Sequence, residues 1–160
     1  MAEYIIQEET LKKLADIIRE KADYESVIRA YVQDRTVFNI NSLPDGLTRI
    51  KDGAFEYCFG MSLTSLPETL TYIGKGAFMS CDLAITAIPK NVVTIAGYAF
   101  INSPKLTNLT FEGTPTSISD TAFNNCSNLV TINVPWAEGA VEGAPWGATN
   151  ATINYKSTGE

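Results

Sequence analysis

The sequence predicts an α/β solenoid of about four to five coils, each of 22–23 residues and made of a short strand and a short helical turn. An N-terminal α-helical cap is expected to precede the coils. Two observations predict this class: an Ala-Phe-x-x-Cys unit and an upstream isoleucine recur with one shared period. A third is that the first residues are charged and amphipathic, unlike the repeats that follow.

The recurring unit is clearest at residues 54–58, Ala-Phe-Glu-Tyr-Cys. Its alanines are Ala54, Ala77, Ala99 and Ala122, which are 23, 22 and 23 residues apart, and one further step of 22 reaches Ala144. The upstream isoleucines show the same spacing: Ile50, Ile73, Ile95 and Ile118. A period in the twenties is typical of stacked solenoids of the leucine-rich type.

Each coil is expected to bury its apolar residues against its neighbours, because one coil alone has no core. The four repeat phenylalanines should form one buried column, each worth roughly 1.5–3 kcal/mol. The Ala-Phe-x-x-Cys segment suits a single helical or 3₁₀ turn. Expected strands are rich in β-branched residues and bounded by Pro or Gly: Leu63–Leu66, Ile85–Ile88, Leu106–Phe111 and Leu129–Val134, with a second extended piece at Leu47–Ile50 and its copies.

This pattern resembles the BspA-like (Treponema pallidum type) leucine-rich repeats, whose unit reads roughly L-x-x-I-x-I-P-x-x-V-T-x-I-G-x-x-A-F-x-x-C. The best matching stretches are Ile73-Gly74-Lys75-Gly76-Ala77-Phe78 through Cys81, and Asn124-Asn125-Cys126-Ser127-Asn128-Leu129. The resemblance covers residues 43 to about 135. It implies a curved solenoid used for binding, commonly on bacterial surfaces or in phage and prophage proteins.

The chain divides into three expected segments. Residues 1–38 form a helical cap or attachment segment, residues 39–135 the repeats, and residues 136–160 a degenerate last coil and C-terminal cap. In the first segment an apolar stripe at helical spacing begins after Thr10, a candidate N-cap. This helix either covers the open end of the solenoid or attaches the protein to a partner or to further copies, as in a trimer, through Leu11, Leu14 and Ile18.

The two flanks carry further resemblances. Residues 9–21, Glu-Thr-Leu-Lys-Lys-Leu-Ala-Asp-Ile-Ile-Arg-Glu-Lys, resemble the E-T-L-x-x-I-A-D-A-I-R-x-K stretch of tail-associated proteins of phages and prophages of Gram-positive bacteria. Ala22-Asp23 replaces the Thr-Gly that usually follows. The ending from Val134 to Tyr155 resembles the C-termini of Gram-positive phage proteins with these repeats. Together the flanks imply a phage origin.

The C-terminal segment keeps the period but loses the unit, since Pro145 stands where the phenylalanine is expected and Trp146 follows it. A closing strand at Ala151–Tyr155 is expected to cover the exposed sheet edge. Trp136 and Trp146 either pack in this cap or serve as exposed anchors for a sugar or a protein.

No motif for catalysis, cofactor binding or metal binding is found. The chain has no histidine, which excludes Ser-His and Cys-His pairs, and it has no phosphate-binding loop of the G-x-x-x-x-G-K-[ST] type. Each of the three cysteines follows a repeat phenylalanine by three residues, and Ser103 fills the same place in the third coil. A small, buried packing position is therefore favoured over a disulfide or a metal site, and three cysteines cannot supply a Cys₄ zinc set.

Composition excludes further classes. The net charge of −6 argues against nucleic acid, because a basic surface is lacking. No run of 18 apolar residues occurs, so no membrane span is expected. The acidic first residues lack the apolar stretch of a signal peptide, which predicts use without the general secretion route unless a leader was removed.

The strand positions that the core does not need are small and uncharged, and stacking should align them in rows. They are either a solvated strand face, with threonine favoured by β propensity, or a polar binding face: Thr64, Ser65, Thr86, Ala87, Thr107, Asn108, Thr131 and Asn133.

The sequence therefore predicts a non-enzymatic phage or prophage virion protein, a tail, baseplate or fibre-associated module that binds other virion proteins or a host-surface protein or glycan. Two other interpretations remain: a bacterial surface adhesin, and an intracellular phage protein that binds a host factor in the cytoplasm.

Overall fold

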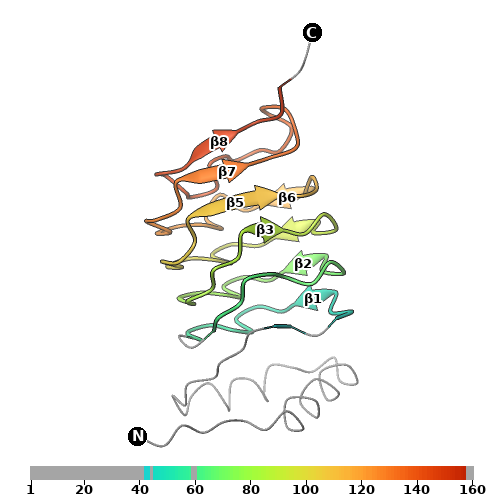
Figure 1. Cartoon of the computed structure of the whole chain (residues 1–160), viewed down its shortest axis with the longest axis vertical. Helices are drawn as coiled ribbons and strands as arrows, with labels where there is room; N and C mark the ends of the chain where they lie inside the picture. Colours follow the sequence, from blue (N-terminus) through green and yellow to red (C-terminus); the bar gives the residue numbers. More distant parts are fainter. Residues whose placement is uncertain (1–41, 44, 59–60, 158–160) are drawn as a thin grey trace, which may run out of the picture.

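The computed structural model describes residues 42, 43, 45–58 and 61–157, which form a column of stacked coils (Figure 1). Two four-stranded parallel sheets run along the column. Sheet A contains β1 (Arg49–Ile50), β2 (Tyr72–Ile73), β4 (Thr94–Ile95) and β6 (Ser117–Ile118). Sheet B contains β3 (Ala87–Ile88), β5 (Asn108–Phe111), β7 (Thr131–Asn133) and β8 (Thr152–Asn154). Neighbouring strands lie one coil apart, which makes every pairing parallel.

The strand register confirms the predicted period. In sheet A, Ile50 pairs with Ile73, Ile73 with Ile95, and Ile95 with Ile118. All four isoleucines are buried, so they form the continuous column that their spacing predicts.

The phenylalanines form a second buried column. The rings of Phe55 and Phe78 lie 5.4 Å apart between centroids, those of Phe78 and Phe100 5.5 Å, and those of Phe100 and Phe123 5.2 Å. The three interplanar angles are 9°, 10° and 1°, so the rings are stacked one coil above another. The column therefore holds adjacent coils in one register.

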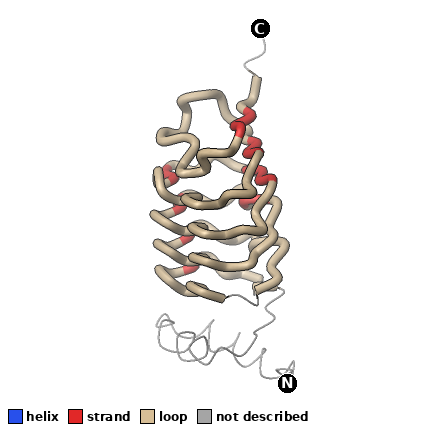
Figure 2. Tube along the Cα trace, turned by 90° about the vertical axis from the view of Figure 1, so that its left-hand side faces the viewer, coloured by secondary structure: helices blue, strands red, loops and turns tan. Residues whose placement is uncertain are grey.

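The expected helical turn at Ala-Phe-x-x-Cys is wrong, because these segments form turns and the described part of the chain contains only strands, loops and turns (Figure 2). The reason is an alternation of backbone hydrogen bonds. The N–H of Glu56 donates to the carbonyl of Gly53 three residues back, and that of Cys58 to Phe55. The intervening N–H of Phe55 instead donates to the carbonyl of Ala77 in the next coil, at 2.8 Å. An α-helix needs every N–H for its own i−4 carbonyl, so bonding between coils replaces it.

The turns place several residues in the left-handed region of φ. In the 55–58 turn, Tyr57 has φ 62° at the third position, where a type II turn requires positive φ. The equivalent residues are Ser80, Asn102 and Asn125, with φ of 56°, 56° and 57°. Close contact between coils also fixes Gly74, where an added Cβ would lie 2.5 Å from the backbone nitrogen of Asp52.

One expected strand is absent, and the other three are shorter than the sequence suggests. Leu63–Leu66 is not a strand, and only the last two residues of Ile85–Ile88 belong to β3. Pro89 corresponds to Glu112 of the next coil, whose N–H donates to the carbonyl of Ile88, and because proline has no N–H the equivalent bond between the expected strands at 63–66 and 85–88 cannot form. One bond, from the N–H of Ala84 to Leu63, remains near the expected pairing. The other two expected strands contain β5 and β7.

The closing strand expected at Ala151–Tyr155 is confirmed by β8, which pairs with β7. The register of the last turn differs from the expectation. Phe123 donates its N–H to the carbonyl of Trp146, whereas Phe100 donates to Ala122 one coil earlier. Trp146 therefore takes the place of the repeat alanine, which the 22-residue step assigns to Ala144. The helical cap and the attachment residues Leu11, Leu14 and Ile18 lie outside the described residues.

Candidate interaction surface

The outward side of sheet B carries two rows of polar side chains, called here the polar strand face. The first row joins Asn108, Thr131 and Thr152, and the second joins Ala87, Thr110, Asn133 and Asn154. The residues between the rows, Leu109 and Ile132, are fully buried. This alternation follows from strand geometry, since successive side chains point to opposite faces of a sheet.

Side-chain hydrogen bonds connect the second row from coil to coil. The amide Nδ2 of Asn133 donates to the Oγ1 of Thr110 at 3.3 Å, and the Nδ2 of Asn154 donates to the Oδ1 of Asn133 at 2.8 Å. Both donors point toward the preceding coil. The row is therefore an ordered ladder with one direction, and it leaves the Oδ1 of Asn154 at its C-terminal end.

The structure brings together part of the predicted binding face. Asn108 and Thr131 are register partners, and Asn133 stands in the neighbouring row. Thr107 and Thr86 are exposed but directly precede β5 and β3, and the exposed Thr64 and Ser65 lie outside any strand. Sequence reasoning missed three members of the rows: Thr110, Thr152 and Asn154. Thr110 lies two residues after Asn108, and Asn154 lies 21 residues after Asn133. These spacings could have identified both residues from the sequence.

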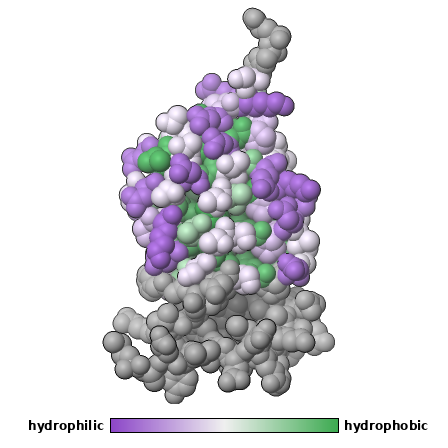
Figure 3. Space-filling model, in the orientation of Figure 1, coloured by the Kyte–Doolittle hydropathy of each residue, from purple (hydrophilic) through white to green (hydrophobic). Residues whose placement is uncertain are grey.

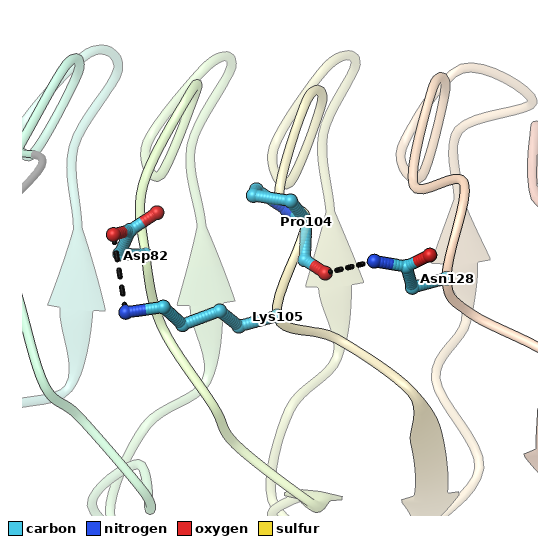
Figure 4. A network of polar contacts seen from close by, with 4 residues as sticks. All are labelled: Asp82, Pro104, Lys105 and Asn128. Carbon is cyan, nitrogen blue, oxygen red and sulfur yellow. Dashed lines mark hydrogen bonds and ion pairs between the residues drawn. The ribbon is translucent and has the colours of Figure 1, made fainter.

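Polar side chains also support the corners between coils (Figure 4). The Nδ2 of Asn128 donates to the carbonyl of Pro104 at 2.8 Å, and Lys105 forms an ion pair with Asp82 at 3.1 Å. Asn150 makes the bond equivalent to that of Asn128, to the carbonyl of Ser127 at 3.2 Å. The two asparagine amides satisfy backbone carbonyls at the turns, so they are structural rather than available for a ligand.

The cysteines are buried packing residues, as the repeat predicts. The Sγ of Cys81 donates to the carbonyl of Phe55 at 2.7 Å, and that of Cys126 to Phe100 at 3.0 Å. Ser103 makes the corresponding bond, from Oγ to the carbonyl of Phe78 at 3.4 Å. The position therefore requires a small side chain with one hydrogen to donate, which both cysteine and serine supply.

Burial also makes these thiols unreactive. It raises the pKa of Cys58 to about 11 and that of Cys126 to about 11, and it raises the pKa of Cys81 further, with a smaller contribution from Cys58. With these raised pKa values the thiols are protonated at neutral pH. The nucleophilic and metal-binding form of cysteine is the thiolate, so that form is not populated. All three are free of disulfides, and no group of three or more candidate metal ligands occurs in the described part of the chain.

The two tryptophans pack in the C-terminal cap. Trp146 is fully buried, and its Nε1 donates to the carbonyl of Glu142 at 2.7 Å. Its ring lies 6.3 Å from that of Trp136 and 6.0 Å from that of Phe111. Trp136 is 5% exposed. The alternative of exposed aromatic anchors is therefore wrong for both residues.

Figure 3 shows that strongly hydrophilic residues gather mainly along the two lateral edges of the coils in this view, with paler and apolar residues between them. The outward residues of the two rows are neutral, since they are asparagine, threonine and alanine. Such a surface can offer hydrogen-bond donors and acceptors at fixed spacing, but it has no charge of its own to attract a distant ligand.

The stacked 22–23-residue coils, the buried phenylalanine column and the parallel sheets define the chain as a repeat solenoid. The chain matches the BspA type leucine-rich repeat region in six copies over residues 27–139. It therefore belongs to the BspA-type leucine-rich repeat family, as its sequence pattern predicts. Comparisons with curated proteins and with solved structures returned no significant match.

The family match is to a repeat used for protein binding, and no catalytic family is matched. Within the part of the chain that the structure describes, no helix has the length and apolar character needed to cross a lipid bilayer.

Proposed function

We propose that this chain is a non-enzymatic binding module of a phage or prophage virion, part of a tail, baseplate or fibre, which recognises its partner through the polar strand face. The family supports a protein-binding role. The resemblance of residues 9–21 and 134–155 to phage proteins supports the virion location. The observation that carries the choice of surface is the register of β5, β7 and β8, which aligns outward polar side chains in two rows.

The chemistry of this face indicates how a partner is recognised. Its rows are neutral, so the partner is selected by shape and by hydrogen bonds rather than by long-range attraction. A protein surface or a glycan with matching donors and acceptors fits this description. Binding should then change little with ionic strength, because no surface ion pair has to be screened.

The surface is tested with one variant on each sheet. Asn108→Lys places a charge on the exposed outward side of β5, and Ser117→Lys places the same charge on the exposed outward side of β6 in sheet A. For both variants, binding of the labelled protein is measured to intact host cells and to purified virions of the phage or prophage that encodes the chain. The proposal expects a loss of binding for Asn108→Lys alone. Equal binding by the two variants would move the site away from sheet B.

The location is tested by mass spectrometry of purified particles. The chain is expected in the particle at a stoichiometry fixed relative to the other tail proteins. If it is instead recovered from the bacterial cell surface, the adhesin interpretation replaces the virion one. Recovery with a cytosolic host protein would favour the intracellular interpretation.

A further inference from the structure

The last strand of sheet B has an edge that no described residue covers. The N–H of Thr152 donates to the carbonyl of Val130, and the carbonyl of Asn154 accepts from the N–H of Val134. These even-numbered residues therefore face β7. Because alternate residues of a strand point their backbone groups to opposite sides, the N–H and the carbonyl of Ile153 face away from β7. The result is a free donor and a free acceptor at the end of the sheet.

The side-chain hydrogen bonds that lead to this edge all run in one direction. In the second row of the polar strand face, each amide donates to the side chain of the preceding coil, from Asn133 to Thr110 and from Asn154 to Asn133. The Oδ1 of Asn154 has no described donor. A strand placed beyond β8 in the same parallel register, with a donor opposite Asn154, would therefore continue both the backbone pairing and the side-chain ladder.

We infer that β8 is a strand-addition site that accepts an extended peptide segment of a partner, in parallel to β8, with asparagine or another hydrogen-bond donor opposite Asn154. The backbone of Ile153 supplies the pairing, and the amide of Asn154 supplies the preference for sequence. Recognition of this kind gains affinity from main-chain hydrogen bonds and specificity from alternate side chains. This inference does not depend on the virion role or on the outward rows as a whole.

Three variants separate the free edge from the paired one. Ile153→Pro removes an N–H that faces away from β7, and proline is tolerated where the N–H of an edge strand faces solvent. Thr152→Pro removes the N–H that bonds Val130, so it is expected to lower stability. Ile153→Ala removes the same side-chain packing as Ile153→Pro but keeps the N–H. Ile153→Pro and Ile153→Ala should therefore unfold at similar urea concentrations.

Binding is measured by calorimetry with a synthetic peptide that has the sequence of residues 150–156, Asn-Ala-Thr-Ile-Asn-Tyr-Lys. In the parallel register its second asparagine lies opposite Asn154. Binding to the Ile153→Pro variant is expected to be weaker by about tenfold or more than to Ile153→Ala, because a main-chain bond is lost and the ring blocks the incoming strand. A second peptide carries leucine in place of that asparagine. It should bind the wild-type chain more weakly than the first peptide does. The Asn154→Leu variant should not bind the second peptide more weakly than the first.

Two results would overturn the inference. One is that the peptide does not bind the wild-type chain, or that it binds the Ile153→Pro and Ile153→Ala variants with equal affinity. The other is a concentration-dependent dimer of the wild-type chain that Ile153→Pro abolishes, since the edge would then take a second copy and not a partner segment. Sedimentation velocity without peptide distinguishes this second case.

Discussion

The phenylalanine column makes a quantitative prediction for Phe100, which is fully buried between two stacked rings. Phe100→Ala removes the ring that contacts Phe78 on one side and Phe123 on the other. Truncating a buried phenylalanine to alanine costs about 3–5 kcal/mol, because the transfer free energy of the ring is lost and a cavity remains. In a solenoid each coil is stabilised mainly by its neighbours, so the loss weakens two interfaces at once.

The assay is urea unfolding followed by circular dichroism. With an m value of about 2 kcal/mol/M, Phe100→Ala should lower the midpoint by roughly 2 M. Phe100→Leu keeps most of the apolar volume and should cost about 1.5 kcal/mol or less. Val130→Ala is the control, since Val130 is 51% exposed and should change stability by less than about 1 kcal/mol. Equal midpoints for Phe100→Ala and Val130→Ala would refute the stacked column.

Three further predictions concern the small buried positions of the coils. Ser103→Ala leaves the carbonyl of Phe78 without its side-chain donor and should cost about 1 kcal/mol in urea unfolding, whereas Ser103→Cys should fold as well as the wild type. Folding raises the pKa of Cys126 from 9.0 to about 11, so the stability linked to this thiol is present below pH 9 and is lost as the pH rises toward 11. Unfolding curves between these pH values should show the loss, and Cys126→Ala should reduce it. Gly74→Ala forces a Cβ against the backbone of Asp52 and should cost about 1–3 kcal/mol, measured as a lower melting temperature.

The sequence predicts the column of coils well because its apolar residues repeat with one period and have one burial pattern. Ile50 and its three copies pair in register, and Phe55 and its copies stack, as equal spacing requires. The closing strand is also predicted correctly, since the alternating residues of Ala151–Tyr155 contain β8, which pairs with β7. Residues that repeat in the sequence therefore have equivalent contacts in the fold.

The parts that differ depend on contacts between coils, which spacing alone does not show. The helical turn fails because the N–H of Phe55 bonds to the next coil rather than to its own. The expected pairing of Leu63–Leu66 lacks one hydrogen bond because Pro89 of the following coil has no N–H to donate. Trp146 occupies the alanine position because the last coil reaches it two residues later than the count predicts. The polar strand face was found only in part, since Thr152 and Asn154 belong to that last coil and Thr110 was missed within β5.

The uniform pairing of the coils has a consequence for how this molecule changes in evolution. Every described strand meets only the strands one coil before and one coil after it. Duplication or loss of one 22–23-residue unit would therefore preserve the contacts of all the others. Each such event changes the separation of the two ends by roughly 4.8 Å, the distance between neighbouring strands. The length of the solenoid therefore changes in steps of one whole repeat.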